Sequence, residues 1–440
     1  MNRNSLNYSL SINLNVYLYM QTSLRIAHQN QNEKWIDILL WLTLTIVPVA
    51  ILPIKVPDIF DAIKGPILIV FGLTILVLLF INNKWDKSLI TWLLCGYLLL
   101  VLMSSTFAYN PLLAFAGVTM SGGRFEGFAT IFIYGILFYA SRNHLKFSKK
   151  KLIWSFSLLS LVAIYSLIQY YQFDPLVIYR RFRPMVFSTI GNQNFLASLM
   201  VMLTVISLGF SVLYKKWYCF ILFVLFFSSL LVAQTRSGWI AFGVVFILMS
   251  VYFLSFKKEY LISYSVSIAI MIFVYFFLNY TKNNILQKRS KTIKKEISLS
   301  DEYGGSGRLK IWEITWHVIQ DHPIFGTGPE NLKSIVHKEH KKEIDEYYRV
   351  KRTSFDKAHN EFLHIAAVSG IPSLIIYLSI LILIFKENLK KMRQDKIHFI
   401  VAIAVLGYSI QAFFNISVIA VAPVYWIFLG FISQKTKGVY

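Results

Sequence analysis

Apolar side chains fall into long runs along this chain, separated by short polar stretches. A run of roughly 20 residues is the length that a helix needs to cross the hydrocarbon of a bilayer. A membrane β-barrel would instead show alternating segments of about 10 residues. The pattern predicts an all-α polytopic membrane protein with about twelve transmembrane helices. The expected spans are 36–54, 66–82, 88–107, 126–141, 152–172, 194–214, 217–234, 237–255, 260–279, 360–385, 397–416 and 418–433.

Composition supports this interpretation. Of 440 residues, 56% are hydrophobic and only 15% are charged, whereas soluble domains have about a quarter charged. The net charge of +22 would suggest nucleic acid in a soluble protein, but in a membrane protein it reflects topology, so no nucleic-acid partner is expected. Cys95 and Cys219 lie inside apolar runs and predict neither a disulfide framework nor a metal motif.

The distribution of lysine predicts the orientation. Short basic loops face the cytoplasm, and the even-numbered loops are the basic ones. They carry Lys84 and Lys87, then Arg142, Lys146 and Lys149–Lys151, then Lys215 and Lys216, Lys257 and Lys258, and Lys386 through Lys396. The expected organisation is a cytoplasmic tail (1–35), nine helices (36–279), a large extracytoplasmic loop (280–358), three helices (360–433) and a second cytoplasmic tail (434–440).

The short outward loops carry fewer lysines, and the positive charge that marks them is mostly arginine. Arg124 is followed by Arg180, Arg181 and Arg183, and then by Arg236 in a short turn. The planar guanidinium keeps its charge and binds phosphate through two hydrogen bonds. One interpretation is that these arginines contact lipid phosphates, but the whole set on one face favours a dedicated anionic site.

The large loop contains one predicted helix and one candidate base. Residues 308–321 place Leu309, Ile311, Trp312, Trp316 and Ile319 near helical spacing, which predicts a helix on the outer bilayer face with Arg308 at its start. Gly304, Gly305 and Gly307 precede it, Pro323 and the turn 326–329 end it, and 282–302 are expected to be flexible. His359 and Asn360 lie where the loop re-enters the membrane. A histidine there can accept a proton near neutral pH, or can simply be an interfacial residue.

Several short stretches resemble, in order, the O-antigen ligase and polymerase superfamily of bacterial envelope glycosyltransferases. They are G-G-R-F-E-G (122–127), T-I-G-N-Q-N-F-L-A (189–197), T-R-S-G (235–238), S-G-R-L-K-I-W (306–312), D-H-P-I-F-G-T-G-P-E-N (321–331) and H-N-E-F-L (359–363). The similarity covers roughly residues 120–380. Val368 stands where the family often has an acidic residue, and Ser373 where it often has glycine.

The resemblance implies a residue-level hypothesis. His359 would be the catalytic residue, Arg236 and Arg308 would bind the donor diphosphate together with Arg124 and Arg180–Arg183, and Asn192, Asn194 and Asn360 would support the site. The expected reaction moves a glycan from undecaprenyl diphosphate to an acceptor hydroxyl, on a lipid or a growing polysaccharide, at the outer face of the cytoplasmic membrane. It would invert the linkage and need no metal or other cofactor.

Two other functions stay open from the sequence. A protein O-oligosaccharyltransferase of the same superfamily would use the same donor and the same residues. A transporter or flippase of lipid-linked glycans would more typically show repeats and broken helices with polar residues at the midplane. No clear repeat is present, and the conspicuous polar residues lie at the outer ends of the expected spans. The sequence does not distinguish a ligase from a polymerase.

Overall fold

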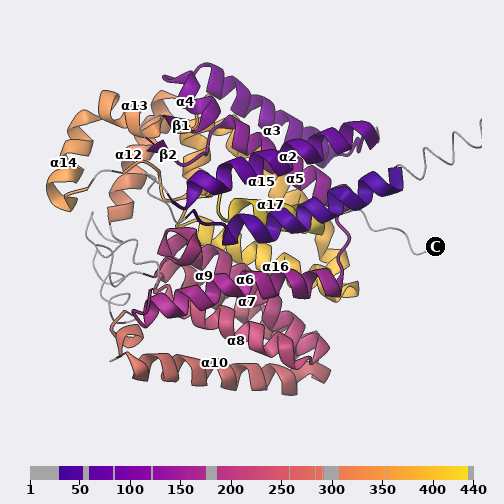
Figure 1. The fold of residues 1–440 in the computed structure, drawn as a ribbon. Coiled ribbons are helices and arrows are strands. Elements are labelled where there is room, and N and C mark those ends of the chain that lie inside the picture. The colour runs from indigo at the N-terminus through magenta and orange to yellow at the C-terminus, as the bar shows by residue number, and fades with distance from the viewer. Residues whose placement is uncertain are drawn as a thin grey trace, which may run out of the picture.

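The computed structural model describes residues 29–434 apart from 53–58, 83–84, 120–121, 175–185, 257, 283, 290, 292–306 and 354. Nearly all of this part is helical, as the sequence predicted (Figure 1). The exception is a hairpin in which β1 (Val118–Thr119) pairs antiparallel with β2 (Gly122–Gly123). The amphipathic and apolar periodicities of the sequence therefore become helices rather than sheets.

Helical residues occur within each of the twelve expected spans. Besides residues 29–49, these helices are α2 (Asp61–Asn82), α3 (Leu89–Thr106), α5 (Phe128–His144), α6 (Lys149–Tyr170), α7 (Gln193–Tyr214), α8 (Trp217–Val232), α9 (Arg236–Phe256), α10 (Leu261–Thr281), α15 (Glu361–Gln394), α16 (Lys396–Ala412) and α17 (Ala422–Ile432). In the described part of the chain, seven helices are long and apolar enough to cross a membrane by length and composition. The helical segments are thus confirmed, while twelve crossings remain a prediction.

Helix α7 forms the centre of the bundle. Every residue from Leu196 to Leu213 is buried, as expected for a helix that is apolar on all sides and surrounded by others. Small residues allow close packing around it. A Cβ at Gly209 would meet Ile400 of α16, and one at Gly238 of α9 would meet Ala197. Small residues at helix contacts are typical of membrane bundles.

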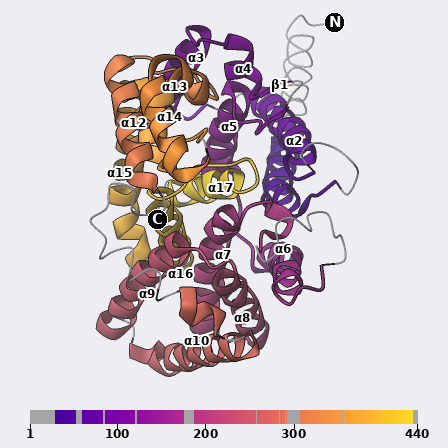
Figure 2. The same cartoon turned by 90° about the vertical axis from the view of Figure 1, so that its left-hand side faces the viewer.

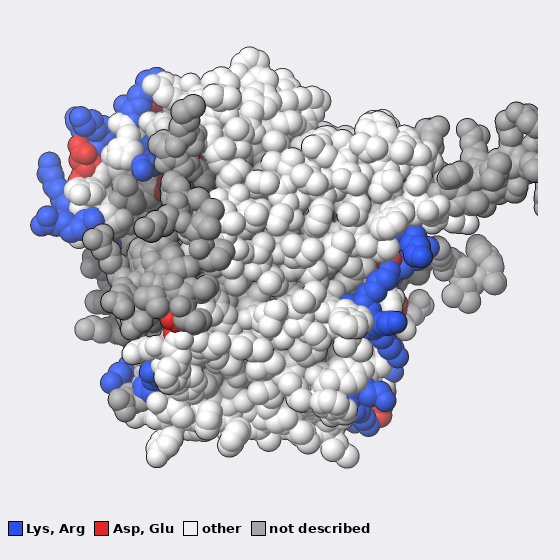
Figure 3. All heavy atoms as spheres, in the orientation of Figure 1, with Lys and Arg blue, Asp and Glu red and all other residues white. Residues whose placement is uncertain are grey.

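The connections between helices gather at two opposite ends of the molecule. The even-numbered connections meet at one end, through contacts that join Asp37 with Lys146, Asp86 with Arg142, and Tyr260 with Lys396. The odd-numbered connections meet at the other, through contacts that join Lys64 with Thr189, Tyr171 with Thr281, and Gln234 with Arg289. On the face drawn in Figure 3, lysine and arginine gather toward these ends, and a broad uncharged band lies between them. This arrangement fits a multi-pass membrane protein.

Three helices form a cap over the odd-numbered end: α12 (Arg308–Asp321), α13 (Leu332–Glu339) and α14 (Lys341–Lys351) (Figure 2). Smaller elements complete the described secondary structure, among them α4 (Pro111–Ala116) and the 3-10 turns η2 (Ser188–Ile190) and η3 (Lys258–Tyr260). Most of the stretch 282–302, expected to be flexible, lies outside the described residues.

Helix α12 has the bounds that the sequence predicted, but its buried face differs. Leu309 is 52% exposed and Trp316 50% exposed, whereas Ile314 and Val318 are buried. The buried face packs into a second apolar cluster with residues of α13, α14 and α15. The structure buries Ile314 and Val318, which the predicted stripe did not include, against other parts of the protein. Contact of Leu309 and Trp316 with a bilayer stays a prediction.

Helix α15 is broken near its first third, and the turn between α12 and α13 docks into the break. Gly370 adopts φ 85° and ψ 161°, which frees the carbonyls of the preceding turn. The Ala367 and Val368 carbonyls accept hydrogen bonds from the amides of Thr327 and Gly328, each at 2.9 Å. A Cβ at Gly370 would lie 1.9 Å from the Ile324 carbonyl oxygen, so only glycine fits there.

Candidate functional site

A cavity of about 320 Å³ lies beneath the cap, within the roughly 300–1,000 Å³ range of ligand pockets. It is framed by the starts of α7, α9 and α12, by α14, and by the turn before α15. Its lining comprises Gln193, Asn194, Arg236, Ser237, Arg289, Arg308, Ile311, Tyr347, Thr353, Phe355 and His359. The cavity therefore combines cations and hydroxyl or amide groups with one imidazole.

Three arginines from separate segments face this cavity. Arg236 is the first residue of α9, Arg308 is the first residue of α12, and Arg289 belongs to the helical turn 285–289. The Arg289 Nε donates to the Gln234 carbonyl at 3.1 Å, which fixes its side chain beside the start of α9. The first residue of α7 also lines the cavity. Because helix N-termini carry partial positive charge, the backbone adds to the field of the arginines.

The pKa of Arg308 reflects the closeness of the other two arginines. Burial, and then the like charges of Arg236 and Arg289, lower the pKa of Arg308 to about 10. The guanidinium is still fully charged at neutral pH. Its charge is destabilised in the absence of an anion, so a ligand with two or more negative charges would bind favourably here.

His359 forms part of the wall of the same cavity. Burial, and then the charge of Arg308, lower the pKa of its imidazole to about 4, although Asp356 acts in the opposite sense. The residue adopts φ 50°, in the left-handed region that is uncommon for residues other than glycine. Its Nδ1 atom is buried and has no hydrogen-bond partner among the described residues. His359 is therefore neutral at pH 7 and able to accept a proton.

Ion pairs hold the segment that carries His359. Arg124 contacts the Asp356 carboxylate at 2.9 Å. Lys357 contacts the Glu126 carboxylate at 2.9 Å and also pairs with Glu330. Lys357 is only 1% exposed, and although burial opposes its charge, the two carboxylates raise its pKa. Two separate loops are thus tied to the residues directly before His359.

Hydrogen bonds fix the same segment on its other side. The Asn360 side chain accepts from the amides of Phe362 and Leu363, at 3.0 and 3.2 Å, and so caps the start of α15. The Glu361 carboxylate accepts from the Ser417 amide at 2.6 Å. The backbone of His359 is therefore constrained on both sides, which is how an uncommon φ persists in a folded protein.

Comparison with known protein families matches one part of the chain. Residues 221–378 match the sequence model of the family described as O-Antigen ligase. This match supports the resemblance of the chain to the O-antigen ligase and polymerase superfamily. No curated protein matches the chain. The matched segment contains Arg236, Arg289, Arg308 and His359, so the three arginines and the histidine that line the cavity all come from the part that carries the family pattern. The match to this family implies membrane association and substrates that are lipid-linked glycans.

The structure places the predicted site residues in three groups. Arg236, Arg308, His359 and Asn194 line the cavity. Arg124 lies next to it, paired with Asp356, and does not line it. Asn192 and Asn360 are helix caps, since the Asn192 side chain accepts from the Asn194 amide at 2.8 Å. Arg180, Arg181 and Arg183 lie outside the described residues.

Sequence reasoning missed Arg289 and Tyr347. Arg289 stands in a basic stretch that was expected to be flexible, and Tyr347 lies in α14, a helix that was not predicted. The sequence does contain one signal for Arg289: it follows the end of α10, the last helix before the large loop, and therefore lies at the same end as Arg236.

Proposed function

We propose that this protein transfers a glycan from undecaprenyl diphosphate to an acceptor hydroxyl at the outer face of the cytoplasmic membrane. The observation that carries the proposal is the cavity in which Arg236, Arg289 and Arg308 surround a space bordered by neutral His359. Arg236 begins a helix that is long and apolar enough to span the membrane, so the cavity opens near headgroup depth. A lipid-linked diphosphate presents its charge at that depth.

The chemistry follows from the charges. The acceptor oxygen forms a bond to the anomeric carbon of the glycan as the bond between that carbon and the diphosphate oxygen breaks. The arginines stabilise the charge that develops on the departing diphosphate, as preorganised donors do in general. His359 takes the proton of the acceptor hydroxyl and returns it to solvent. A single displacement of this kind inverts the linkage, and arginine supplies the charge for which other transferases use a divalent cation.

A test of this function uses purified protein in proteoliposomes with a lipid-linked glycan donor and labelled acceptor. We expect a labelled product together with released undecaprenyl diphosphate. A ladder of products indicates a polymerase, a single addition to a lipid indicates a ligase, and a labelled protein indicates an O-oligosaccharyltransferase. Movement of intact donor between leaflets without any product would contradict the proposal and support a flippase.

Arg308→Ala is expected to lower kcat/KM about 10²–10³-fold, the usual effect of removing one preorganised donor from a developing anion. Arg289→Ala should act in the same direction. Arg308→Lys should recover only part of the loss, because lysine keeps the charge but not the two-pronged contact. The matched control is Arg349→Ala, an exposed arginine of α14 that does not line the cavity. Equal kcat/KM in Arg308→Ala and Arg349→Ala would contradict the assignment.

The pH profile of kcat/KM should show that the pKa of His359 lies below that of an ordinary histidine. Because burial and Arg308 lower its pKa to about 4, kcat/KM should stay level from neutral pH down to well below 6.5 and then fall as the imidazole protonates. Bound diphosphate offsets the charge of the arginines, so the acidic limb of kcat should lie at higher pH than that of kcat/KM. An acidic limb of kcat/KM at 6.5 or above would show that the described environment of His359 is wrong.

A further inference from the structure

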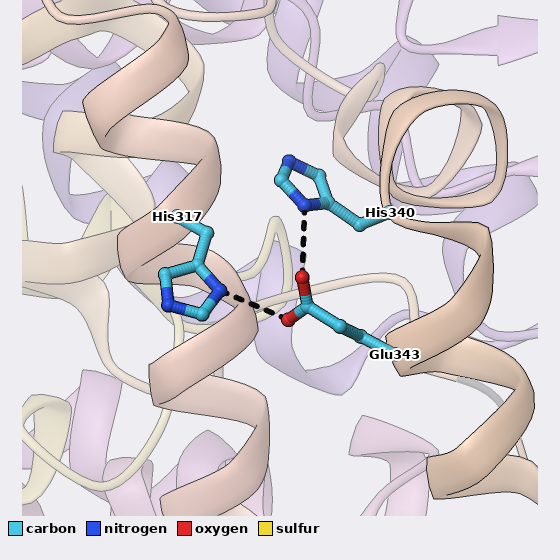
Figure 4. Close-up of side chains that lie close together, drawn as sticks. All are labelled: His317, His340 and Glu343. Atoms are coloured by element: carbon cyan, nitrogen blue, oxygen red, sulfur yellow. Dashed lines mark hydrogen bonds and ion pairs between the residues drawn. The ribbon is translucent and has the colours of Figure 1, made fainter.

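Two histidines and a glutamate converge in the cap, away from the cavity. His317 comes from α12, His340 joins α13 to α14, and Glu343 lies in the first turn of α14 (Figure 4). The His317 Nδ1 lies 2.9 Å from one oxygen of the Glu343 carboxylate, and the His340 Nδ1 lies 3.2 Å from the other. The three candidate ligand atoms lie within 4.8 Å of one another. Both histidines thus direct their Nδ1 atoms toward the carboxylate of Glu343.

Asp321 lies where a carboxylate would support His340 as a metal ligand. The Nε2 of His340, on the side of the ring away from Glu343, lies 3.2 Å from the Asp321 carboxylate, within ion-pair distance but not aligned as a hydrogen bond. A ligating histidine usually has a carboxylate or carbonyl at its second nitrogen, which fixes the ring and makes it a better ligand. His340 is also the more enclosed of the two histidines, with a side chain 9% exposed against 39% for His317.

We propose that the cap binds one divalent transition-metal ion of the zinc class through His317, His340 and Glu343, with water completing the coordination. Two imidazoles and one carboxylate suit zinc, whereas magnesium and calcium prefer oxygen ligands throughout. Small rotations of the three side chains bring their atoms to about 2.0–2.2 Å from an ion placed between them. The ion would replace the protons that now lie between each ring and the carboxylate.

The position of this metal site indicates a structural role. The ion would join α12 to the junction of α13 and α14. Arg308 at the start of α12 and Tyr347 of α14 both line the cavity, so the ion would fix the two cap helices that cover it. None of the three ligands lines the cavity, so the ion takes no part in glycan transfer. The inference rests on cap geometry and does not depend on the proposed function.

The test uses full-length protein without an affinity tag, stripped with EDTA, given zinc and then dialysed in detergent to remove the excess. We expect one zinc per chain by elemental analysis, and a zinc-induced rise in melting temperature that magnesium does not cause. His317→Gln and Glu343→Gln should each weaken zinc binding by at least about tenfold, the order of loss seen when a site loses a supporting group. The matched control, His322→Gln, removes a cap histidine that pairs with Glu339 at 2.8 Å and should bind zinc normally.

Two outcomes would overturn the metal site. One is wild-type protein that binds no stoichiometric zinc, and the other is equal zinc binding by wild type, His317→Gln and Glu343→Gln. Size-exclusion elution shows whether each variant is folded. If a variant fails to fold, the wild type decides by itself.

Discussion

Replacing His359 with alanine is expected to lower the rate of glycan transfer about 10²–10⁴-fold, the usual contribution of a positioned general base. The imidazole is neutral at pH 7 because burial and Arg308 hold its pKa at about 4, so it is ready to take the acceptor proton. Alanine removes that acceptor and leaves the three arginines in place. The loss should therefore appear in kcat, while the dissociation constant of the donor changes little or decreases slightly.

Donor titration and single-turnover rates in proteoliposomes separate these two effects. His322→Ala is the matched control, because His322 lies in the cap and does not line the cavity. A loss of donor binding equal to the loss of rate would mean that His359 holds the diphosphate rather than acting as the base. Full activity in His359→Ala would exclude both roles.

Lys357→Met is expected to destabilise the protein by about 3–5 kcal/mol, as breaking a buried ion pair by removing one partner usually does. The ammonium is 1% exposed and pairs with Glu126 and Glu330. Methionine leaves two buried carboxylates without their cation. Thermal or denaturant unfolding in detergent measures the loss, and Lys341→Met, at an exposed position of α14, serves as the control.

The pH dependence of the Lys357→Met variant provides an internal check. Burial raises the pKa of Glu126 in the wild type even though Lys357 acts in the opposite sense, and removing the lysine raises it further. A carboxyl group whose pKa is higher in the folded state costs stability once the pH rises above its unfolded value near 4.3. The stability deficit of the variant should therefore shrink as the pH falls toward 4. A deficit that is constant across pH would assign the loss to packing alone.

The ion pairs of Lys357 also bear on catalysis. Lys357 lies two residues before His359, and its partners come from the loops at 122–127 and 321–331. Four of the six stretches that resemble the family contribute residues that line the cavity, and these two hold the segment that carries His359. Each stretch is short in the sequence, but the fold brings their residues to the cavity or to the segment that carries His359.

Sequence patterns predicted the helical segments because a span needs only its own apolar run. The same holds for α12, whose bounds follow from the glycines before it and the proline after it. Arginine at the outward ends of spans indicated Arg236, and the short stretch 306–312 that resembles the family indicated Arg308. Each of these predictions used local information, and each residue lines the cavity.

Tertiary contacts explain what the sequence could not predict. Leu309 and Trp316 fit a helical stripe as well as Ile314 and Val318 do, and only the packing of α13–α15 decides which side is buried. Arg289 faces the cavity because the fold brings the end of α10 beside the start of α9. Lys357 pairs with Glu126, which is 231 positions away in the sequence, and with Glu330, which is 27 positions away. No local sequence pattern indicates such pairs.

The most direct test compares wild type with His359→Ala in proteoliposomes that contain an undecaprenyl-diphosphate glycan and an acceptor. The proposed mechanism predicts product and released undecaprenyl diphosphate in equal amounts from the wild type, and product lowered by the same large factor as kcat from the variant. Equal product from both proteins, or no product from a wild type that binds donor and acceptor, would contradict the claim that this arginine-lined cavity transfers glycans with His359 as its base.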